Sequence, residues 1–294
     1  MAIIIVIVVI VIIAMIILEV PRYCRLRKID LVKFDDDYDQ VHAKNRFKTS
    51  HRTVVSLTTT PDRITLLGPT LASLLDQSIR VDEIAVNIPY KSRKGQEYVI
   101  PEWLSNLKHV KLYRVELDEG PATKLLPTLR REKEDTRIIV VDDDVILNSK
   151  CLQVLSDSYN VVDCAITNYG IKLSENAQLP NNFKRVAHFM TKSREVDLLQ
   201  GFSAFLVTPK MFEGQLHLMQ ELPKDLITVD DIIFSGMLAL NKIRIATPGH
   251  TFLQLPLVNL GEMRKTPALG SNENKKFVTD NAAIKWFREV KGIW

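Results

Sequence analysis

The sequence has 294 residues, of which 46% are hydrophobic and 25% are charged, with a formal net charge of +4. This composition is typical of a folded chain long enough for one α/β domain with a sizeable core, and it excludes a disordered or fibrous protein. Residues 53–294 carry 30 Lys and Arg against 29 Asp and Glu. Without a concentrated basic face, no nucleic-acid partner is expected.

Residues 2–18 form an unbroken apolar run rich in Ile and Val, about as long as a short membrane span. A cleaved signal peptide is the alternative, but no basic region precedes the run and residues 18–21 lack a small-residue cleavage pattern. We therefore expect a single-pass transmembrane anchor over residues 1–20, a basic and polar linker over residues 21–52, and one folded domain over residues 53–294.

The side of the membrane on which the domain lies is open. By the positive-inside rule, the basic cluster after the span predicts that the domain faces the cytosol, and a domain in the Golgi or ER lumen is the alternative. The cluster also suits contact with anionic lipid, and it consists of Arg22, Arg25, Arg27 and Lys28. The three cysteines include no Cys-x-x-Cys pair, so neither a disulfide framework nor a zinc site is expected.

After residue 52, strand and helix patterns alternate along the chain. Short β-branched apolar runs predict strands, and leucines at helical spacing predict helices. The alternation predicts an α/β domain with a mostly parallel central sheet flanked by helices. The expected strands are 53–57, 84–88, 110–115, 137–141, 202–207 and 243–246, and the expected helices are 66–78, 152–159, 230–240 and 280–290.

The strand expected over residues 137–141 ends in three consecutive carboxylates, Asp142, Asp143 and Asp144. The apolar run fits a strand buried on both faces, but unpaired charges cannot continue into a core. Ligands of open α/β sheets bind at the carboxyl ends of the strands, where a cation or a phosphate can meet the acids. Residues two apart in an extended chain share a side, so Asp142 and Asp144 can face one Mg²⁺ or Mn²⁺ ion. A hydrogen-bonded turn is the alternative.

A second run of three aspartates, residues 35–37, provides an internal comparison. No apolar strand precedes it, and it lies in a polar stretch. We interpret it as part of the solvated linker.

Other polar residues follow the first two expected strands. Thr58, Thr60 and Arg63 can hold the ribose, base or diphosphate of a nucleotide, although Thr60 can instead cap a helix. Asn87 can read a base edge or make an ordinary hydrogen bond at the end of its strand.

Three further positions have a chemical and a structural interpretation. Lys124 follows a Gly-Pro break at an expected helix start, where a diphosphate is favoured, or it is a surface lysine. Asp230 and Asp231 open an apolar helix; capping explains one acid, and two suggest a general base, with Asp231 the better candidate. His250 is a third metal ligand, a phosphate contact or a structural histidine.

Together these motifs resemble the GT-A fold glycosyltransferases that use nucleotide-sugars, particularly family 2-like enzymes. Their Asp-x-Asp hallmark is similar to residues 142–144, and their nucleotide and diphosphate regions are similar to residues 56–63 and 118–124. Gln200 and Gly201 resemble the acceptor-side segment that precedes the catalytic acid, and Asp230-Asp231 stand where inverting members carry their base. The chain lacks a motif for processive polymer synthesis.

The resemblance implies a Rossmann-like GT-A domain that uses Mn²⁺ or Mg²⁺. Such an enzyme moves a sugar from a nucleotide-diphosphate donor to a hydroxyl of a glycan, glycoprotein or glycolipid by direct, inverting displacement. It implies that Asp142, Asp144 and His250 hold the ion, that Asp143 helps to bind the donor, and that Asp231 takes the acceptor proton. The alternatives are another metal-dependent nucleotide enzyme, such as a nucleotidyltransferase, and a membrane-tethered carbohydrate-binding module.

Overall fold

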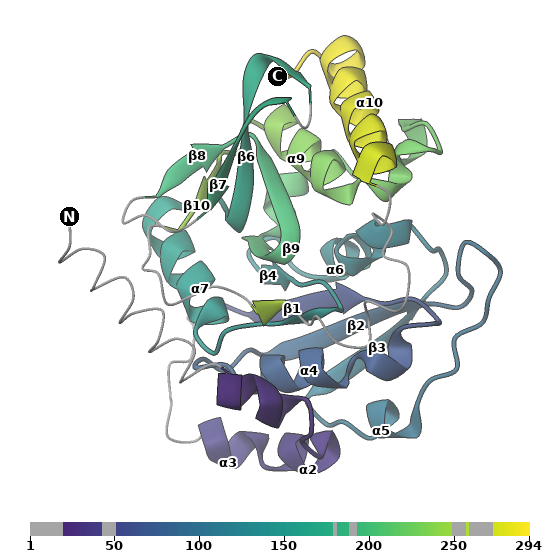
Figure 1. The fold of residues 1–294 in the computed structure, drawn as a ribbon, viewed down its shortest axis with the longest axis vertical. Coiled ribbons are helices and arrows are strands. Elements are labelled where there is room, and N and C mark those ends of the chain that lie inside the picture. The colour runs from purple at the N-terminus through teal and green to yellow at the C-terminus, as the bar shows by residue number, and fades with distance from the viewer. Residues whose placement is uncertain (1–19, 43–50, 179–180, 188–192, 249–256, 259–272) are drawn as a thin grey trace.

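The computed structural model describes residues 20–42, 51–178, 181–187, 193–248, 257–258 and 273–294. These residues form a mixed central sheet with helices on both faces (Figure 1). The strand order is β3-β2-β1-β4-β9-β6-β10-β8, with β7 paired to β6, and β5 and β11 form a separate pair. The strands are β1 Thr53–Thr58, β2 Glu83–Pro89, β3 Val110–Val115, β4 Arg137–Val140, β5 Val145–Ile146, β6 Ala165–Gln178, β7 Asn181–Ala187, β8 Arg194–Val196, β9 Leu198–Val207, β10 Ile245–Thr247 and β11 Leu257–Val258.

The two halves of the sheet differ in strand direction. β1 pairs in parallel with β2 and β4, and β2 pairs in parallel with β3. β9 runs antiparallel to both of its neighbours, β4 and β6. The expected α/β class is confirmed, but the expectation of a mostly parallel sheet is wrong: beyond β4 only β6 and β10 pair in parallel, and the other pairs of the described strands in this sheet are antiparallel. Parallel neighbours need a long crossover between them, whereas β6 and β7 follow each other closely and pair antiparallel.

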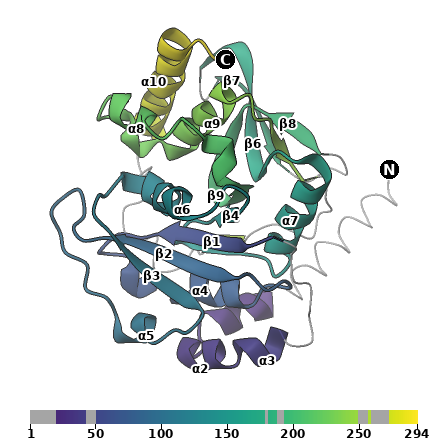
Figure 2. The same ribbon diagram turned by 180° about the vertical axis from the view of Figure 1, so that it is seen from behind.

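The helices cover both faces of this sheet. In Figure 1 α2, α3 and α4 lie on one side of β1–β3, and in Figure 2 α6, α9 and α10 lie on the other. The expected helix over residues 66–78 is shorter in the structure, where a 3₁₀ turn precedes α4. The helical segments are α2 Leu31–Asp36, α3 Tyr38–His42, η1 Ile64–Leu66, α4 Gly68–Leu75, α5 Glu102–Ser105, η2 Gly120–Lys124, α6 Leu126–Arg131, α7 Cys151–Val162, η3 Pro209–Phe212, α8 Leu218–Glu221, η4 Leu226–Thr228, α9 Asp230–Leu240 and α10 Glu273–Lys291.

β4 separates two hydrophobic clusters. Ile139 faces the cluster that contains α4, and Ile138 and Val140 face the cluster that contains α9 and α10. All three are fully buried, as predicted for a strand covered on both sides. The burial holds the end of β4, and the acids that follow it, at a fixed place in the sheet.

The N-terminal segment corrects part of the sequence interpretation. Residues 20–26 are helical, and Leu26 is buried, so this part of the predicted linker packs on the domain. Arg22 and Arg25 both pair with Asp76, at 2.6 Å and 2.8 Å, so these two members of the basic cluster neutralise a protein carboxylate.

The aspartate run at residues 35–37 is also not a solvated linker throughout. Asp35 is buried and accepts hydrogen bonds from the backbone N–H groups of Lys108 and His109. An ionised carboxylate that accepts backbone bonds can be buried at low cost, a compensation that only the folded chain provides.

In the part of the chain that the structure describes, no helix is both long and apolar enough to cross a membrane. The anchor expected over residues 1–20 lies outside the described residues except for Val20, and it stays a prediction.

Candidate active site

The three aspartates that follow β4 differ in exposure. Asp143 is buried, whereas the side chains of Asp142 and Asp144 keep 29% and 35% of their surface exposed. β4 ends at Val140, and Asp143 and Asp144 lie in a turn, so this difference in exposure arises from the turn and not from an extended chain. The outer acids are therefore available to a ligand, and the middle acid is not.

Asp143 connects residues 142–144, which we call the aspartate turn, to the loop that follows β1. Thr59 Oγ1 donates a hydrogen bond to Asp143 Oδ2 at 2.7 Å, and Arg63 lies 2.6 Å from Oδ1. Burial raises the pKa of Asp143 to about 7, because the Arg63 charge and the Thr59 hydrogen bond only partly offset desolvation. Arg63 also lies 2.8 Å from Asp144 Oδ2, so one guanidinium contacts two of the three acids.

Lys124, at the end of η2, is the buried cation of the site. Its Nζ lies 2.7 Å from Asp142 Oδ1 and 2.8 Å from Asp230 Oδ2, and only 6% of its side chain is exposed. Burial alone lowers the pKa of this ammonium, but the charges of Asp142, Asp230 and Asp231 outweigh it and raise the pKa well above its ordinary value. Lys124 is therefore a permanent positive charge that connects the aspartate turn to the start of α9.

Asp231 lies beside this cation at the first turn of α9. Its Oδ1 accepts a hydrogen bond from the backbone N–H of Gly201 in β9 at 3.0 Å. Burial raises the pKa of Asp231 to about 7; the neighbouring Asp230 raises it further, and Lys124 opposes both. α9 begins after Val229 and has no side-chain cap, so neither acid has the capping role that was the alternative.

Gly201 is required sterically at this point. A Cβ at this position would lie 2.8 Å from Asp231 Oδ1 and 2.8 Å from Lys124 Nζ. The missing side chain lets β9, η2 and α9 converge. The structure thus brings together five of the residues singled out from the sequence, namely Lys124, Asp142, Gly201, Asp230 and Asp231.

Two predicted donor-binding residues, Asn87 and Thr58, have side-chain partners within the protein, and a third, Thr60, does not have its alternative role as a helix cap. Asn87 is fully buried, and its amide nitrogen donates to Ser56 Oγ and Thr128 Oγ1, both at 3.1 Å. Thr58 Oγ1 donates to the carbonyl of Asn87 at 2.7 Å. These contacts match the structural alternative for Asn87. The carbonyl of Thr60 accepts from the N–H of Arg63, and Arg63 itself is the N-cap of η1, so Thr60 does not cap a helix.

Of two other predicted residues, the structure describes Gln200 but not His250. Gln200 is half-buried in β9, and its carbonyl accepts a hydrogen bond from Thr167 Oγ1 at 3.4 Å. His250 lies outside the described residues, so its expected role stays a prediction.

Two residues near the turn were not predicted. Thr59 belongs to the loop whose hydroxyls were considered for nucleotide binding but was not named as a site residue, and Tyr98 donates its hydroxyl to the Thr59 carbonyl at 3.0 Å. A run of three threonines after a strand was a usable signal for Thr59. No sequence signal indicated Tyr98, because the contact joins positions 39 residues apart.

Asp142 and Asp144 are suited to a divalent cation, although the full ligand set is not present in the described residues. These residues contain no group of three or more His, Cys, Asp or Glu arranged to hold a metal. The two outer acids nevertheless offer partly exposed hard oxygens, and the Lys124 ammonium shows that positive charge is stable beside Asp142. The acids therefore fit an ion such as Mg²⁺, which commonly binds one or two carboxylates and takes its other ligands from water and phosphate.

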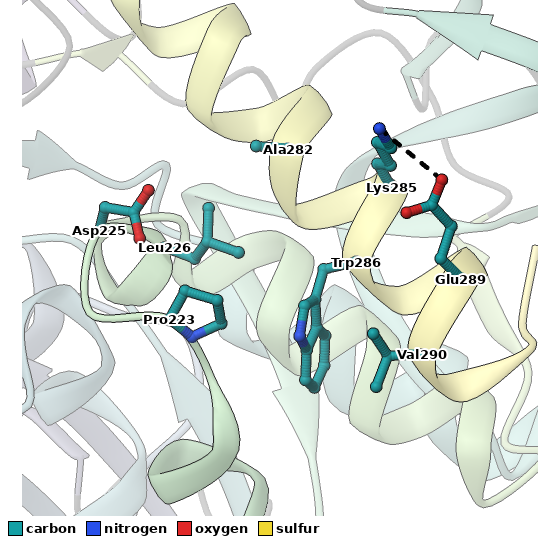
Figure 3. A pocket seen from close by; sticks show the side chains of 8 residues that line it. All are labelled: Pro223, Asp225, Leu226, Ala282, Lys285, Trp286, Glu289 and Val290. Carbon is teal, nitrogen blue, oxygen red and sulfur yellow. Dashed lines mark ion pairs between the residues drawn. The ribbon is translucent and has the colours of Figure 1, made fainter.

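Two cavities in the described part of the molecule lie away from the acids. One, of about 270 Å³, is lined by residues of η4 and α10 that include Leu226 and Trp286 (Figure 3). The other, of about 300 Å³, is lined by residues from Tyr113 to Glu119 and by α6. Neither includes a residue singled out from the sequence.

No family model and no curated protein matches this chain. Its fold is similar to that of GalNAc-T7 solved with UDP, GalNAc and Mn²⁺, with a TM-score of 0.51 and 15% identity over 81% of this chain and 56% of the other. S. aureus TarS 1–349 in complex with UDP-GlcNAc gives a TM-score of 0.47 and 16% identity over 77% of this chain and 64% of TarS. The TarS complex with UDP gives 0.44 and 17% over 68% and 58%.

The chain thus spans less than two thirds of the length of each of these structures. The similarity to GalNAc-T7 shows a shared GT-A-like α/β fold.

Proposed function

We propose that this protein is a glycosyltransferase that moves a sugar from a nucleoside-diphosphate donor to an acceptor hydroxyl. The observation that carries the proposal is the buried Lys124 ammonium, 2.7 Å from Asp142 and 2.8 Å from Asp230. This ammonium connects residues 142–144, which suit a metal ion and a diphosphate, to α9. The candidate base lies at the start of α9. The GT-A-like fold supports this assignment, and GalNAc-T7, which shares it, was solved with UDP, GalNAc and Mn²⁺.

The donor is proposed to bind at the aspartate turn. Asp142 and Asp144 would hold a divalent ion, which when bound supplies positive charge to the leaving diphosphate. Among the described residues, Lys124 and Arg63 are cations in contact with these acids, and they would add donors and charge to the phosphate oxygens. Thr58, Thr60 and Asn87 have smaller parts in this proposal, because the described contacts of Thr58 and Asn87 are made within the protein.

Asp231 is proposed as the general base, with Asp230 as its charged neighbour. A base works best when its pKa is close to the operating pH, and burial raises the pKa of Asp231 to about 7. The Gly201 N–H orients one carboxylate oxygen, so the other can accept the proton of the acceptor hydroxyl. Attack of this hydroxyl oxygen on the anomeric carbon, from the face opposite the bond to the leaving diphosphate, would break that bond and invert the configuration.

Release of nucleoside diphosphate tests the proposal. The full chain is incubated with UDP- and GDP-sugars and Mn²⁺, with and without saccharide acceptors, and products are identified by mass spectrometry. Sugar transfer that is lost in Asp231→Asn and reduced by EDTA supports it. Nucleotide transfer identifies a nucleotidyltransferase, and donor binding without any turnover identifies a binding module; either result contradicts the proposal.

We also infer from residues 2–18 that the domain is tethered to a membrane by a single span. Extraction of the expressed protein into detergent, but not into alkaline carbonate, supports a span. Recovery in the carbonate supernatant contradicts it. Protease protection in sealed vesicles then separates the cytosolic from the lumenal orientation.

A further inference from the structure

We propose that the cavity between η4 and α10 is a subsite for one ring of a neutral saccharide acceptor. This inference rests on the proposed glycosyltransferase function and extends it, because it requires an acceptor that is a glycan of more than one sugar unit. It involves residues that were not singled out from the sequence.

Five of the eight residues that line the cavity are apolar, and one of these five is aromatic. In Figure 3 Pro223 and Leu226 lie on one side of the hollow, and Trp286 and Val290 of α10 lie on the other. The indole is held in place by an edge-to-face contact with Phe287, whose ring centroid is 5.0 Å away. The Lys291 ammonium lies over the ring, 5.5 Å from its centroid, so the surface on which the C–H face of a pyranose can lie is the part of the indole that lines the cavity.

The polar groups at the cavity suit hydroxyls better than phosphates. Asp225 and Glu289 supply carboxylate acceptors, and Lys285 supplies an ammonium donor that is 3.7 Å from Glu289. With two acids and one base, the lining is not positive, so a nucleotide or a phosphorylated ligand is disfavoured. A neutral polyol can donate to the acids and accept from the ammonium.

The size of the cavity also limits the ligand. Its volume of about 270 Å³ is just below the roughly 300–1,000 Å³ of sites for drug-sized ligands, which fits a ligand about one ring in size. An exposed hydrophobic surface of this kind is also a feature of binding grooves. Val290, which is 57% exposed, adds to that surface.

The cavity is connected to the proposed base through a short segment. η4 contacts both η2, which contains Lys124, and α10, which contains Trp286. Asp225 at the cavity precedes Asp231 by six residues, a chain length that spans at most about 20 Å. Asp225 thus lies within the length of a glycan of a few sugar units from Asp231, and the proposal requires that such a glycan place its terminal hydroxyl at Asp231 and a more distant ring on Trp286.

The test measures saccharide binding without the donor. Saturation-transfer NMR on the full chain uses methyl glucoside, methyl galactoside, lactose, maltose and N,N′-diacetylchitobiose as probes. We expect transfer to the ring C–H protons of at least one probe, and an approximately tenfold weaker affinity in Trp286→Leu than in Trp286→Phe, which keeps an aromatic face.

A matched pair on α10 controls for stability and charge. Ala282→Arg places a long side chain in the cavity, whereas Val278→Arg places the same charge at a 69% exposed position of the same helix that does not line it. Only Ala282→Arg is expected to abolish saccharide binding and, in transfer assays, to raise KM for disaccharides without changing donor hydrolysis.

The possible outcomes separate this inference from the function on which it rests. If no probe receives saturation transfer, or if Val278→Arg weakens binding as much as Ala282→Arg, the subsite assignment is overturned even when sugar transfer occurs. If saccharides bind at Trp286 but no donor is turned over, the proposed function fails and the binding site stands.

Discussion

The backbone N–H of Gly201 donates to Asp231 Oδ1 at 3.0 Å, and a Cβ on Gly201 would lie 2.8 Å from the same oxygen and 2.8 Å from Lys124 Nζ. Contacts of 2.8 Å to a Cβ essentially never occur, so Gly201→Ala must displace the lysine, the acid or both. We predict a loss of kcat of about tenfold to a hundredfold and a loss of unfolding free energy smaller than that of Lys124→Met, because the buried ion pairs of Lys124 and the hydrogen bond of Asp231 are displaced but not removed.

A glycine without neighbours provides the control for this variant. A Cβ on Gly68 would meet nothing within 4 Å, so Gly68→Ala is expected to keep full activity. Steady-state kinetics of both variants check the prediction, and equal activities would contradict the assigned role of Gly201.

Lys124→Met should destabilise the protein because it removes the cation shared by Asp142 and Asp230. Breaking a buried ion pair by deleting one partner typically costs about 3 kcal/mol, and two carboxylates remain here. Urea denaturation measures the loss. In the double variant Lys124→Met/Asp230→Asn, the added Asp230→Asn change should recover part of it, and strictly additive losses would show that the pair is not coupled.

The pH dependence of turnover should follow Asp231. Because only the ionised carboxylate accepts a proton, and its pKa is raised to about 7, kcat/KM should fall as the pH drops below about 7. Asp231→Asn should lose most activity at every pH. An acid limb near pH 4 would contradict this role.

The raised pKa of Asp231 also predicts how the stability of the protein depends on pH. Between pH 3.8, the ordinary pKa of an aspartate, and about 7, the folded state holds a proton on Asp231 that the unfolded state has lost. The ligand-free protein should therefore lose stability as the pH rises through this window. The buried Asp143, with a pKa raised to about 7, contributes in the same direction. In thermal melts, the decrease in Tm as the pH rises through this window should be smaller for Asp143→Asn than for the wild type.

Ala204 in β9 is a strained residue three positions after Gly201. Its φ of +119° lies in the region that favours glycine, and the residue is fully buried. Ala204→Gly should stabilise the protein by about 1 kcal/mol, since relief of the strain exceeds the added chain entropy of the unfolded state. Ala85 is buried in β2 and has no positive φ, so it provides the control. Ala85→Gly should lower the free energy of unfolding. Urea midpoints decide the sign.

Asp76 should hold the helical residues 20–26 against the domain. Its side chain is only 18% exposed and forms ion pairs with both Arg22 and Arg25. Asp76→Ala should therefore lower the free energy of unfolding by about 1 kcal/mol and make residues 20–26 accessible to trypsin. Asp39 pairs with Arg80 at an exposed position, where both side chains are at least 50% exposed. Asp39→Ala should therefore have almost no effect on unfolding or cleavage. Equal cleavage in both variants would contradict this anchoring.

Some features could be read directly from local patterns. The alternation of strands and helices predicted the α/β class, and the apolar run before Asp142 predicted a strand buried on both faces, because burial on both sides leaves no polar positions. The different exposure of Asp142, Asp143 and Asp144 does not come from the two-residue period of an extended chain, because Asp143 and Asp144 lie in a turn after β4.

Other features depend on contacts between distant residues. The antiparallel pairing of β9 with β4 and β6, the burial of Asp35 and the hydrogen bonds of Asn87 all depend on partners that no local pattern specifies. For this reason two predictions had to be corrected: a mostly parallel sheet, and a solvated linker at residues 35–37.

The sequence by itself determined which residues carry charge at the ends of strands and where apolar runs must be covered, because these properties belong to each residue and its near neighbours. Only the tertiary structure decided that the Lys124 ammonium is placed between Asp142 and Asp230, and that Asp231 meets a glycine N–H. These contacts join η2, β9, α9 and the end of β4. A pKa near 7 arises only when the fold removes water from a carboxylate and fixes its charged neighbours, and neither condition exists in the unfolded chain.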